Sequence, residues 1–287
     1  VVFVADQILV RYNLVSSRIS RKFIHVCAGS WIMFWPYFVV VDDNDGASSG
    51  WWKLNIIVPA IYSVQLLYKG LFLRRPPQTS SSKGVATAVT VVVVDDPDVR
   101  SMTRTGNPRE LLNGPLMFTL TMCVVGIYCF RTQLGVVIMS MLTYGDGIAP
   151  LIGYYYPYGR YRTFPFITSE EEDNGNNGKK DKRNNTNNNS NQNSGSYKTL
   201  SGSFGFWCAS IVGYYLLASI ALATPYETNH NNNNSSDNGN NNDHDYLPLP
   251  IIVQIATTCT IAESLSGSFD NVAVAITAAV TYHYLLP

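Results

Sequence analysis

Charged residues are scarce in this sequence. Asp, Glu, Lys and Arg make up 14% of its residues, whereas soluble globular proteins contain about 25%. The 20 acidic and 20 basic residues cancel to a net charge of zero, which excludes a global positive field that would attract nucleic acid. A length of 287 residues would suit one large or two small soluble domains, but the scarcity of charge argues against a soluble protein.

Paired cysteines are also missing. The five cysteines all lie inside apolar runs and none forms a CxxC pair, which favours small buried side chains over a zinc site or a disulfide framework. A GxxxxGK[ST] phosphate-binding loop is absent as well. The chain begins with Val1, so we expect a fragment or a processed form, and the absence of a targeting peptide from this sequence carries no information.

Long apolar runs are abundant instead. A bilayer core of about 30 Å is crossed by roughly 20 apolar residues in a helix. The expected spans are residues 23–41, 52–73, 115–130, 133–153, 203–223, 247–265 and 271–286. Residues 1–10 would be a truncated earlier span. The sequence therefore predicts an all-α fold, a polytopic transmembrane helix bundle with about seven spans; a soluble helical bundle would need more amphipathic helices.

Basic residues alternate between the loops that connect these spans. Lys and Arg precede the 23–41 span and follow the 52–73 and 133–153 spans. The loops that follow the 23–41 and 203–223 spans contain acidic residues and neither Lys nor Arg. This alternation matches the positive-inside pattern of membrane proteins and supports the predicted spans.

Two Asn-rich tracts, residues 174–194 and 229–242, interrupt the apolar chain. Their composition is too polar to build a core, so we expect disordered insertions. The remaining sequence predicts a single membrane-embedded domain over residues 1–287.

Polar residues suited to chemistry gather in four stretches, which the charge alternation puts at one face of the bilayer. They are residues 21–25 (RKFIH), 109–116 (RELLNGPL), 145–160 continued by 198–203, and 263–271. Ionisable groups inside a membrane span are costly and usually functional, and Asp146, His25 and Glu263 fit this description best.

Asp146 lies between Gly145 and Gly147, late in an apolar run. Glycines allow the backbone to approach a ligand closely. A carboxylate in this setting suits Mg²⁺ that is shared with phosphate oxygens. The alternative is a helix kink in which Asp146 simply bonds to a neighbouring helix.

Lys198, Ser201, Gly202 and Ser203 lead into an apolar run, and small residues at a helix start can bind an anion. Taken alone, this stretch is better explained as a plain helix N-cap with a snorkelling lysine.

Arg21 and His25 are four residues apart, so with Lys22 they form a basic group near one helical face. This group could hold phosphate or carry a proton, or Arg21 and Lys22 could anchor the helix at the interface. Glu263 and Asp270 could bind a metal ion or act as a general base, or Asp270 could only cap the last helix.

In this order the four stretches resemble the phytol kinase and dolichol kinase family of polytopic, CTP-using lipid-alcohol kinases. The matching patterns are RKxxH, GDGxAxxxG followed by YG, K[ST]xxGS, and a late Glu followed by DN. The resemblance runs from about Arg18 to the C-terminus apart from the Asn-rich tracts, and RELLNGPL resembles the phytol and farnesol branch. Pro150 stands where the family usually has an acid, and an insertion separates Arg160 from Lys198.

The resemblance implies transfer of phosphate from CTP, or UTP, to a long isoprenoid alcohol. The expected acceptor is phytol, giving phytyl phosphate for tocopherol synthesis in a chloroplast membrane. The expected partners are the lipid bilayer, a prenyl alcohol and a nucleoside triphosphate. Asp146 would hold Mg²⁺, with Glu263 or Asp270 as a further metal ligand or as the group that orients the alcohol hydroxyl.

The candidate residues fall into two groups. The catalytic candidates are Asp146, Glu263, Asp270 and His25. The nucleotide- and phosphate-binding candidates are Arg21, Lys22, Arg109, Gly145, Gly147, Lys198, Ser201, Gly202, Ser203 and Asn271.

Other functions stay open at this point. A farnesol, geranylgeraniol or dolichol kinase would differ only in the tail that its pocket accepts, and a CTP-dependent cytidylyltransferase would release pyrophosphate instead of CDP. An ion-coupled transporter also uses broken helices and intramembrane acids, although its site would lie near the midplane. The sequence leaves the oligomeric state open.

Overall fold

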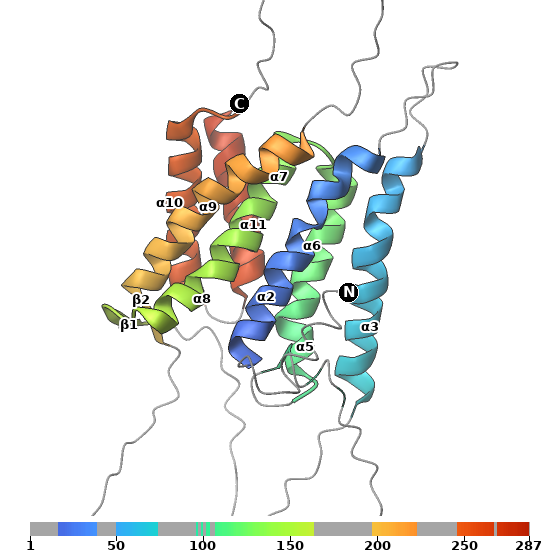
Figure 1. Ribbon diagram of the computed structural model, residues 1–287, viewed down its shortest axis with the longest axis horizontal. Helices are drawn as coiled ribbons and strands as arrows, with labels where there is room; N and C mark the ends of the chain where they lie inside the picture. The colour runs from blue at the N-terminus through green and yellow to red at the C-terminus, as the bar shows by residue number, and fades with distance from the viewer. Residues whose placement is uncertain are drawn as a thin grey trace, which may run out of the picture.

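The computed structural model describes residues 17–38, 50–73, 96, 99, 102–103, 107–163, 197–222, 246–266 and 269–286. The longer helices are α2 (Ser17–Gly29), α3 (Ile57–Phe72), α6 (Pro115–Tyr128), α7 (Gln133–Ser140), α8 (Asp146–Tyr155), α9 (Leu200–Ala221), α10 (Leu249–Leu265) and α11 (Asp270–Leu285). Shorter elements are η1 (Ser30–Phe38), η2 (Gly50–Ile56), α5 (Glu110–Asn113), η3 (Met141–Gly145), β1 (Arg160–Arg162) and β2 (Tyr197–Thr199). The helices run side by side as a bundle with α3 at one edge (Figure 1), so the predicted all-α architecture is confirmed.

Within the described residues, four helical segments are long and apolar enough to cross a membrane. They are Trp52–Phe72, Glu110–Tyr128, Gln133–Tyr155 and Leu200–Ala221. These four segments correspond to four of the seven expected spans. The α10 helix is apolar but shorter, with 17 residues, and α11 has 16. Residues 1–10 and both Asn-rich tracts lie outside the described residues.

The first expected span, residues 23–41, is not a continuous α-helix. The α2 helix ends at Gly29, and a 3₁₀ helix, η1, continues the chain to Phe38. Pro36 lies inside η1 and has no N–H group to donate to a preceding carbonyl, which disfavours continued α-helix. Residues 39–41 lie outside the described part of the chain.

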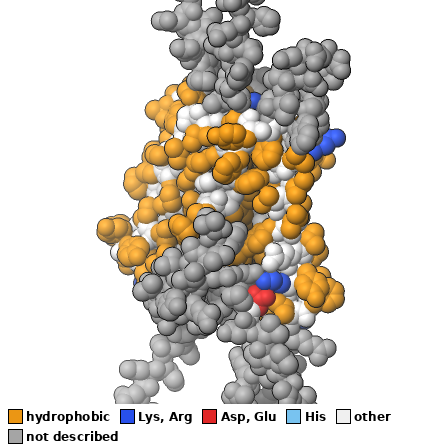
Figure 2. All heavy atoms as spheres, turned by 45° about the vertical axis from the view of Figure 1, so that its right-hand side comes forward, with side chains coloured by type: hydrophobic (Ala, Val, Ile, Leu, Met, Phe, Trp, Pro, Cys, Tyr) orange, Lys and Arg blue, Asp and Glu red, His pale blue; other side chains and the backbone are white. Residues whose placement is uncertain are grey.

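The outer surface is apolar. On α3, Ile61, Val64 and Leu71 are each more than half exposed. Figure 2 shows apolar side chains over most of the described surface on that side of the molecule, with charged side chains near the two ends. This distribution is expected for helices that face lipid rather than water.

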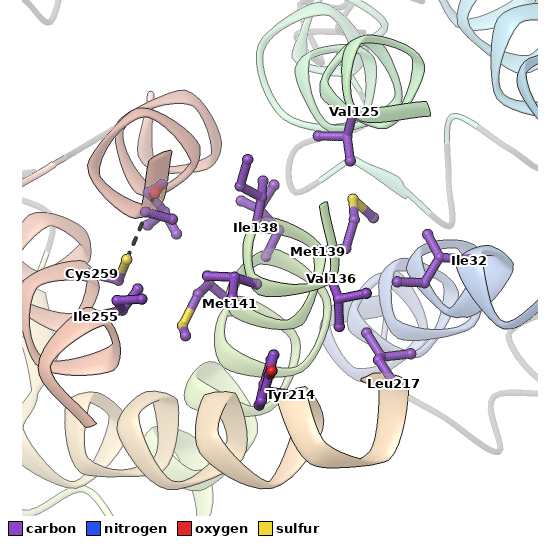
Figure 3. Close-up of a cluster of buried hydrophobic side chains, with 14 of the residues drawn as sticks. Ile32, Val125, Val136, Ile138, Met139, Met141, Tyr214, Leu217, Ile255 and Cys259 are labelled. Atoms are coloured by element: carbon purple, nitrogen blue, oxygen red, sulfur yellow. Dashed lines mark hydrogen bonds between the residues drawn. The ribbon is translucent and has the colours of Figure 1, made fainter. Parts of the chain in front are cut away.

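The core centres on the helical segment formed by α7 and η3. Val136, Met139 and Met141 are fully buried there. Figure 3 shows these side chains between Tyr214 and Leu217 of α9 on one side and Ile255 and Cys259 of α10 on another, with Val125 of α6 and Ile32 of η1 nearby. All five cysteines are free, and Cys259 is buried.

A second, smaller apolar cluster joins α2, α3 and α5 near the start of α6. Its buried members are Ile24, Leu66, Val99, Met102, Leu111 and Leu116. This cluster brings the first two polar stretches of the sequence to the same end of the bundle, because Ile24 follows Lys22 and Leu111 and Leu116 belong to RELLNGPL.

Candidate active site

Lys22 of α2 and Asp146 of α8 form a buried ion pair. Lys22 Nζ lies 2.8 Å from Asp146 Oδ2 and donates to the backbone oxygen of Asp146 at 3.0 Å. The two side chains are 11% and 9% exposed. Gly147 permits this close approach of the helices, since a Cβ atom there would overlap Cγ2 of Val26 on α2. A buried carboxylate in an apolar bundle is tolerated because this ammonium group neutralises it.

The backbone ahead of Asp146 forms a single π-helical turn, η3. The amide of Asp146 donates to the carbonyl of Met141, five residues back, rather than to Leu142. The carbonyl of Leu142 accepts from His25 Nε2 at 2.9 Å. Such turns are rare and often occur at functional sites. The wider turn therefore lets a side chain of α2 bond to the backbone beside Asp146.

His25 must carry a proton on Nε2, because a carbonyl oxygen only accepts hydrogen bonds. The same nitrogen lies 3.4 Å from Asp146 Oδ2. The imidazole also packs on Phe118 of α6, with ring centroids 3.7 Å apart. These contacts fix His25 as a neighbour that orients Asp146.

A second lysine–carboxylate pair joins β2 to α10. Lys198 Nζ lies 2.6 Å from Glu263 Oε1 and also donates to the backbone oxygen of Glu263. The side chains are 18% and 8% exposed. Each of the two intramembrane carboxylates singled out by the sequence is thus matched with a lysine from a distant polar stretch.

The two halves of the third polar stretch meet in a short antiparallel hairpin. Strand β1 pairs with β2, and Tyr161 stands opposite Lys198 in the register. The Tyr161 hydroxyl lies 2.6 Å from Ser203 Oγ, which in turn lies 3.2 Å from Ser264 Oγ. The hairpin therefore brings Lys198 and Tyr161 together to the end of α10 that carries Glu263.

Tyr161 and Ser264 were not among the residues predicted for the site. The available signal lay in two short segments, RYR at residues 160–162 before the insertion and YKT at residues 197–199 after it. Both are compatible with the period of two that a strand requires. The Asn-rich insertion hides this pairing in the sequence, because it separates the two short segments.

The N-terminus of α9 is already bonded to protein groups. Thr199 Oγ1 caps the helix and accepts from the amide of Gly202 at 3.1 Å. The amides of Leu200 and Ser201 donate to the carbonyls of Gly159 and Tyr158. These three backbone donors therefore already have protein partners, as do the side chains of Lys198, Ser201 and Ser203.

The fourth polar stretch joins the same cluster. Asp270 interacts electrostatically with Asp146, Lys22 and Lys198, and Glu263 interacts with Asp146 and Asp270. Three carboxylates and two ammonium groups therefore lie close enough for their charges to act on one another. This mixed sign matches what a metal–nucleotide site needs.

Three other predicted site residues, Arg21, Gly145 and Arg109, differ in their distance from the lysine–carboxylate pairs. The charge of Arg21 acts on His25, so Arg21 lies beside the cluster. Gly145 packs on Ser210 and Phe206 of α9. The Arg109 side chain is exposed; its backbone amide donates to Asn107 Oδ1, and its carbonyl accepts from the amide of Leu112. The start of RELLNGPL is thus at the periphery of the cluster.

No group of three or more His, Cys, Asp or Glu side chains forms a metal cage among the described residues. Mg²⁺ seldom needs such a cage, because it keeps several waters and binds through one or two carboxylates together with substrate phosphates. Asp146 and Glu263, each a buried carboxylate beside a lysine, are of the type that could supply such a ligand.

Comparison with known proteins finds plant lipid-alcohol kinases. The chain is 28% identical over 162 residues to a protein of Glycine max named probable phytol kinase 1, chloroplastic, covering 54% of this chain and 45% of that protein. It is 30% identical over 143 residues to a protein of the same name from Oryza sativa subsp. japonica, covering 49% of this chain and 37% of that one. It is 25% identical over 159 residues to farnesol kinase, chloroplastic, of Arabidopsis thaliana, covering 53% and 43%.

These matches support the resemblance to phytol and polyprenol kinases. The matched region spans less than half the length of these curated relatives. No family model matches the chain, and no solved structure matches it either.

Proposed function

We propose that this protein is a membrane-embedded kinase that phosphorylates the hydroxyl of a long isoprenoid alcohol. The observation that carries the proposal is the convergence of all four polar stretches on one cluster of carboxylates and lysines at one end of an apolar bundle. The similarity to proteins named phytol kinase and farnesol kinase supports the substrate class. The favoured reaction transfers phosphate from CTP to phytol in a chloroplast membrane, and its phytyl phosphate product would serve tocopherol synthesis.

The charge arrangement suits a nucleotide donor. Phosphoryl transfer depends mainly on positioning and on neutralisation of the phosphate charge. In the described cluster, Lys22 and Lys198 each bond to a carboxylate. Lys22 and Lys198 would hold phosphate oxygens of the nucleotide, and Asp146 and Glu263 would hold Mg²⁺. In such an exchange of ionic partners, the charges of Lys22, Asp146, Lys198 and Glu263 would be neutralised both before and after binding.

Mg²⁺ would supply charge neutralisation and in-line alignment of the phosphates. The protein's own residues do the remaining work. The bond to Leu142 and the contact with Phe118 fix the His25 ring, and the fixed ring lies beside the Asp146 carboxylate and orients it. Tyr161 and Ser203 hold the hairpin that carries Lys198. The apolar tail of the alcohol would lie between the helices, with its hydroxyl presented at the cluster.

The direct test is to incubate membranes that contain the protein with γ-labelled CTP and a panel of prenyl alcohols. Labelled lipid phosphate is expected with phytol and not with dolichol. Release of CDP rather than pyrophosphate would separate a kinase from a cytidylyltransferase. Transfer to none of the alcohols would overturn the proposal.

The matched variants are Asp146→Asn and Asp96→Asn. Both remove a carboxylate that pairs with a lysine, but the partner of Asp96 is Lys69 on α3, which is not one of the two lysines of the cluster. Asp146→Asn should abolish phosphorylation while the protein stays in the membrane, and Asp96→Asn should retain most activity. Full activity in Asp146→Asn would exclude Asp146 as the metal ligand.

A further inference from the structure

Asn271, the second residue of α11, has an unusual hydrogen-bonding arrangement. Its side chain is 7% exposed. Nδ2 donates to the backbone oxygen of Gly114 at 3.3 Å. Oδ1 is buried and has no hydrogen-bond partner among the residues that the structure describes. Buried polar atoms are almost always paired, so an unpaired one calls for a physical explanation.

The orientation of this amide is set by its neighbour. The carbonyl of Gly114 can only accept a hydrogen bond, so the NH₂ group of Asn271 must face it. The Gly114 carbonyl also accepts from the backbone amide of Phe118 at 3.1 Å, and turning the side-chain amide round would bring two acceptor oxygens together with no hydrogen between them. Asn271 Oδ1 therefore points away from Gly114 as a fixed acceptor.

The chemistry of an acceptor oxygen limits its ligand. Phosphate oxygens at neutral pH are themselves acceptors, so they do not suit Asn271 Oδ1, although the sequence pattern placed Asn271 with the phosphate-binding residues. A matching ligand must offer an O–H group, an N–H group or a cation.

The residues around Asn271 favour one of these kinds of ligand. Leu111 and Leu116, on either side of Gly114, belong to the buried apolar cluster that also contains Ile24. Asp270 directly precedes Asn271, and its Oδ1 accepts from the backbone amide of Asn271 at 3.0 Å. A buried acceptor beside the Gly114 segment, whose leucines pack in an apolar cluster, suits a hydroxyl at the end of an apolar chain better than a nucleotide base.

We infer that Asn271 Oδ1 accepts the hydrogen bond of the substrate alcohol's hydroxyl, and that the Gly114 carbonyl holds the amide in the orientation this requires. The inference rests on the proposed kinase function and assigns its acceptor-binding residue. It also gives a structural task to RELLNGPL, whose Gly114 orients a side chain 157 residues away in sequence.

The test is equilibrium binding of phytol and of phytol methyl ether to the full chain in lipid nanodiscs, without nucleotide. The ether keeps the tail and the oxygen but has no hydroxyl proton to donate. Wild-type protein should prefer the alcohol on the order of 2- to 12-fold, which is the range of a net hydrogen bond. Asn271→Ala and the near-isosteric Asn271→Leu should both bind the two ligands equally.

Asn113→Ala is the matched control, because Asn113 is exposed and precedes Gly114. It should keep the wild-type preference. In steady-state assays, Asn271→Ala should raise KM for the alcohol and leave KM for CTP unchanged. The inference would be overturned by a retained alcohol preference in both Asn271 variants, or by a rise in KM for CTP alone. Because binding is measured without nucleotide, a wild-type protein that prefers the alcohol but transfers no phosphate would contradict the kinase proposal separately.

Discussion

The Lys22–Asp146 pair allows a quantitative prediction for Lys22→Met. Methionine keeps the length of the side chain but leaves Asp146 as a carboxylate, 9% exposed, without its ammonium partner. Removing one partner of a buried ion pair costs about 3–5 kcal/mol of unfolding free energy. His25 Nε2 remains 3.4 Å from the carboxylate, so we expect a loss near the lower end, about 3 kcal/mol.

The double variant Lys22→Met/Asp146→Asn removes both charges together. Replacing a buried pair by neutral side chains is often close to neutral for stability, so the double variant should recover to within about 1 kcal/mol of wild type. Lys53→Met is the control, since Lys53 is exposed and contacts only the ring of Trp52 in the described structure. It should cost no more than about 1 kcal/mol.

Reversible denaturant unfolding in mixed detergent micelles, followed by tryptophan fluorescence, measures these differences. Two results would refute the reasoning: a Lys22→Met variant as stable as Lys53→Met, or a double variant as unstable as Lys22→Met alone. The first would mean that Asp146 is hydrated in the protein. The second would mean that Lys22 contributes through packing of its stem rather than through its charge.

Three further predictions concern the elements that support the cluster. Tyr161→Phe should cost about 1 kcal/mol of stability through loss of the hydroxyl bond and should raise KM for CTP, because the hairpin then holds Lys198 less firmly; unchanged kinetics would contradict this role. Gly147→Ala should destabilise by about 1–3 kcal/mol because its methyl group overlaps Val26, and a second change, Val26→Ala, should restore stability in the same unfolding assay. Thr199→Ala should cost about 1 kcal/mol through loss of the helix cap, and Thr199→Ser should restore it.

Local backbone physics explains which membrane spans could be predicted from the sequence and which features of the helices could not. Apolar length predicted the segments at 52–73, 115–130, 133–153 and 203–223 well, because an apolar run in a bilayer must satisfy its own backbone hydrogen bonds as a helix. The 3₁₀ segment that replaces α-helix after Gly29, and the π turn before Asp146, were not predicted. Both depend on which carbonyl groups find side-chain or backbone partners in neighbouring helices.

The candidate site also has features that the sequence predicts and features that depend on the tertiary structure. The sequence by itself determined which residues are costly to bury, because the transfer free energy of Asp146 or Glu263 into an apolar bundle depends on residue type alone. It also predicted that the polar stretches share one face, through the positions of Lys and Arg.

Only the tertiary structure decided the partners within that face. It pairs Lys22 with Asp146 across 124 residues and Lys198 with Glu263 across 65, and it turns Asn271 by means of Gly114. Periodicity and composition report the local hydrogen bonds and the solvent preference of a segment. The choice among several nearby opposite charges depends instead on distances of a few ångströms, which helix packing sets.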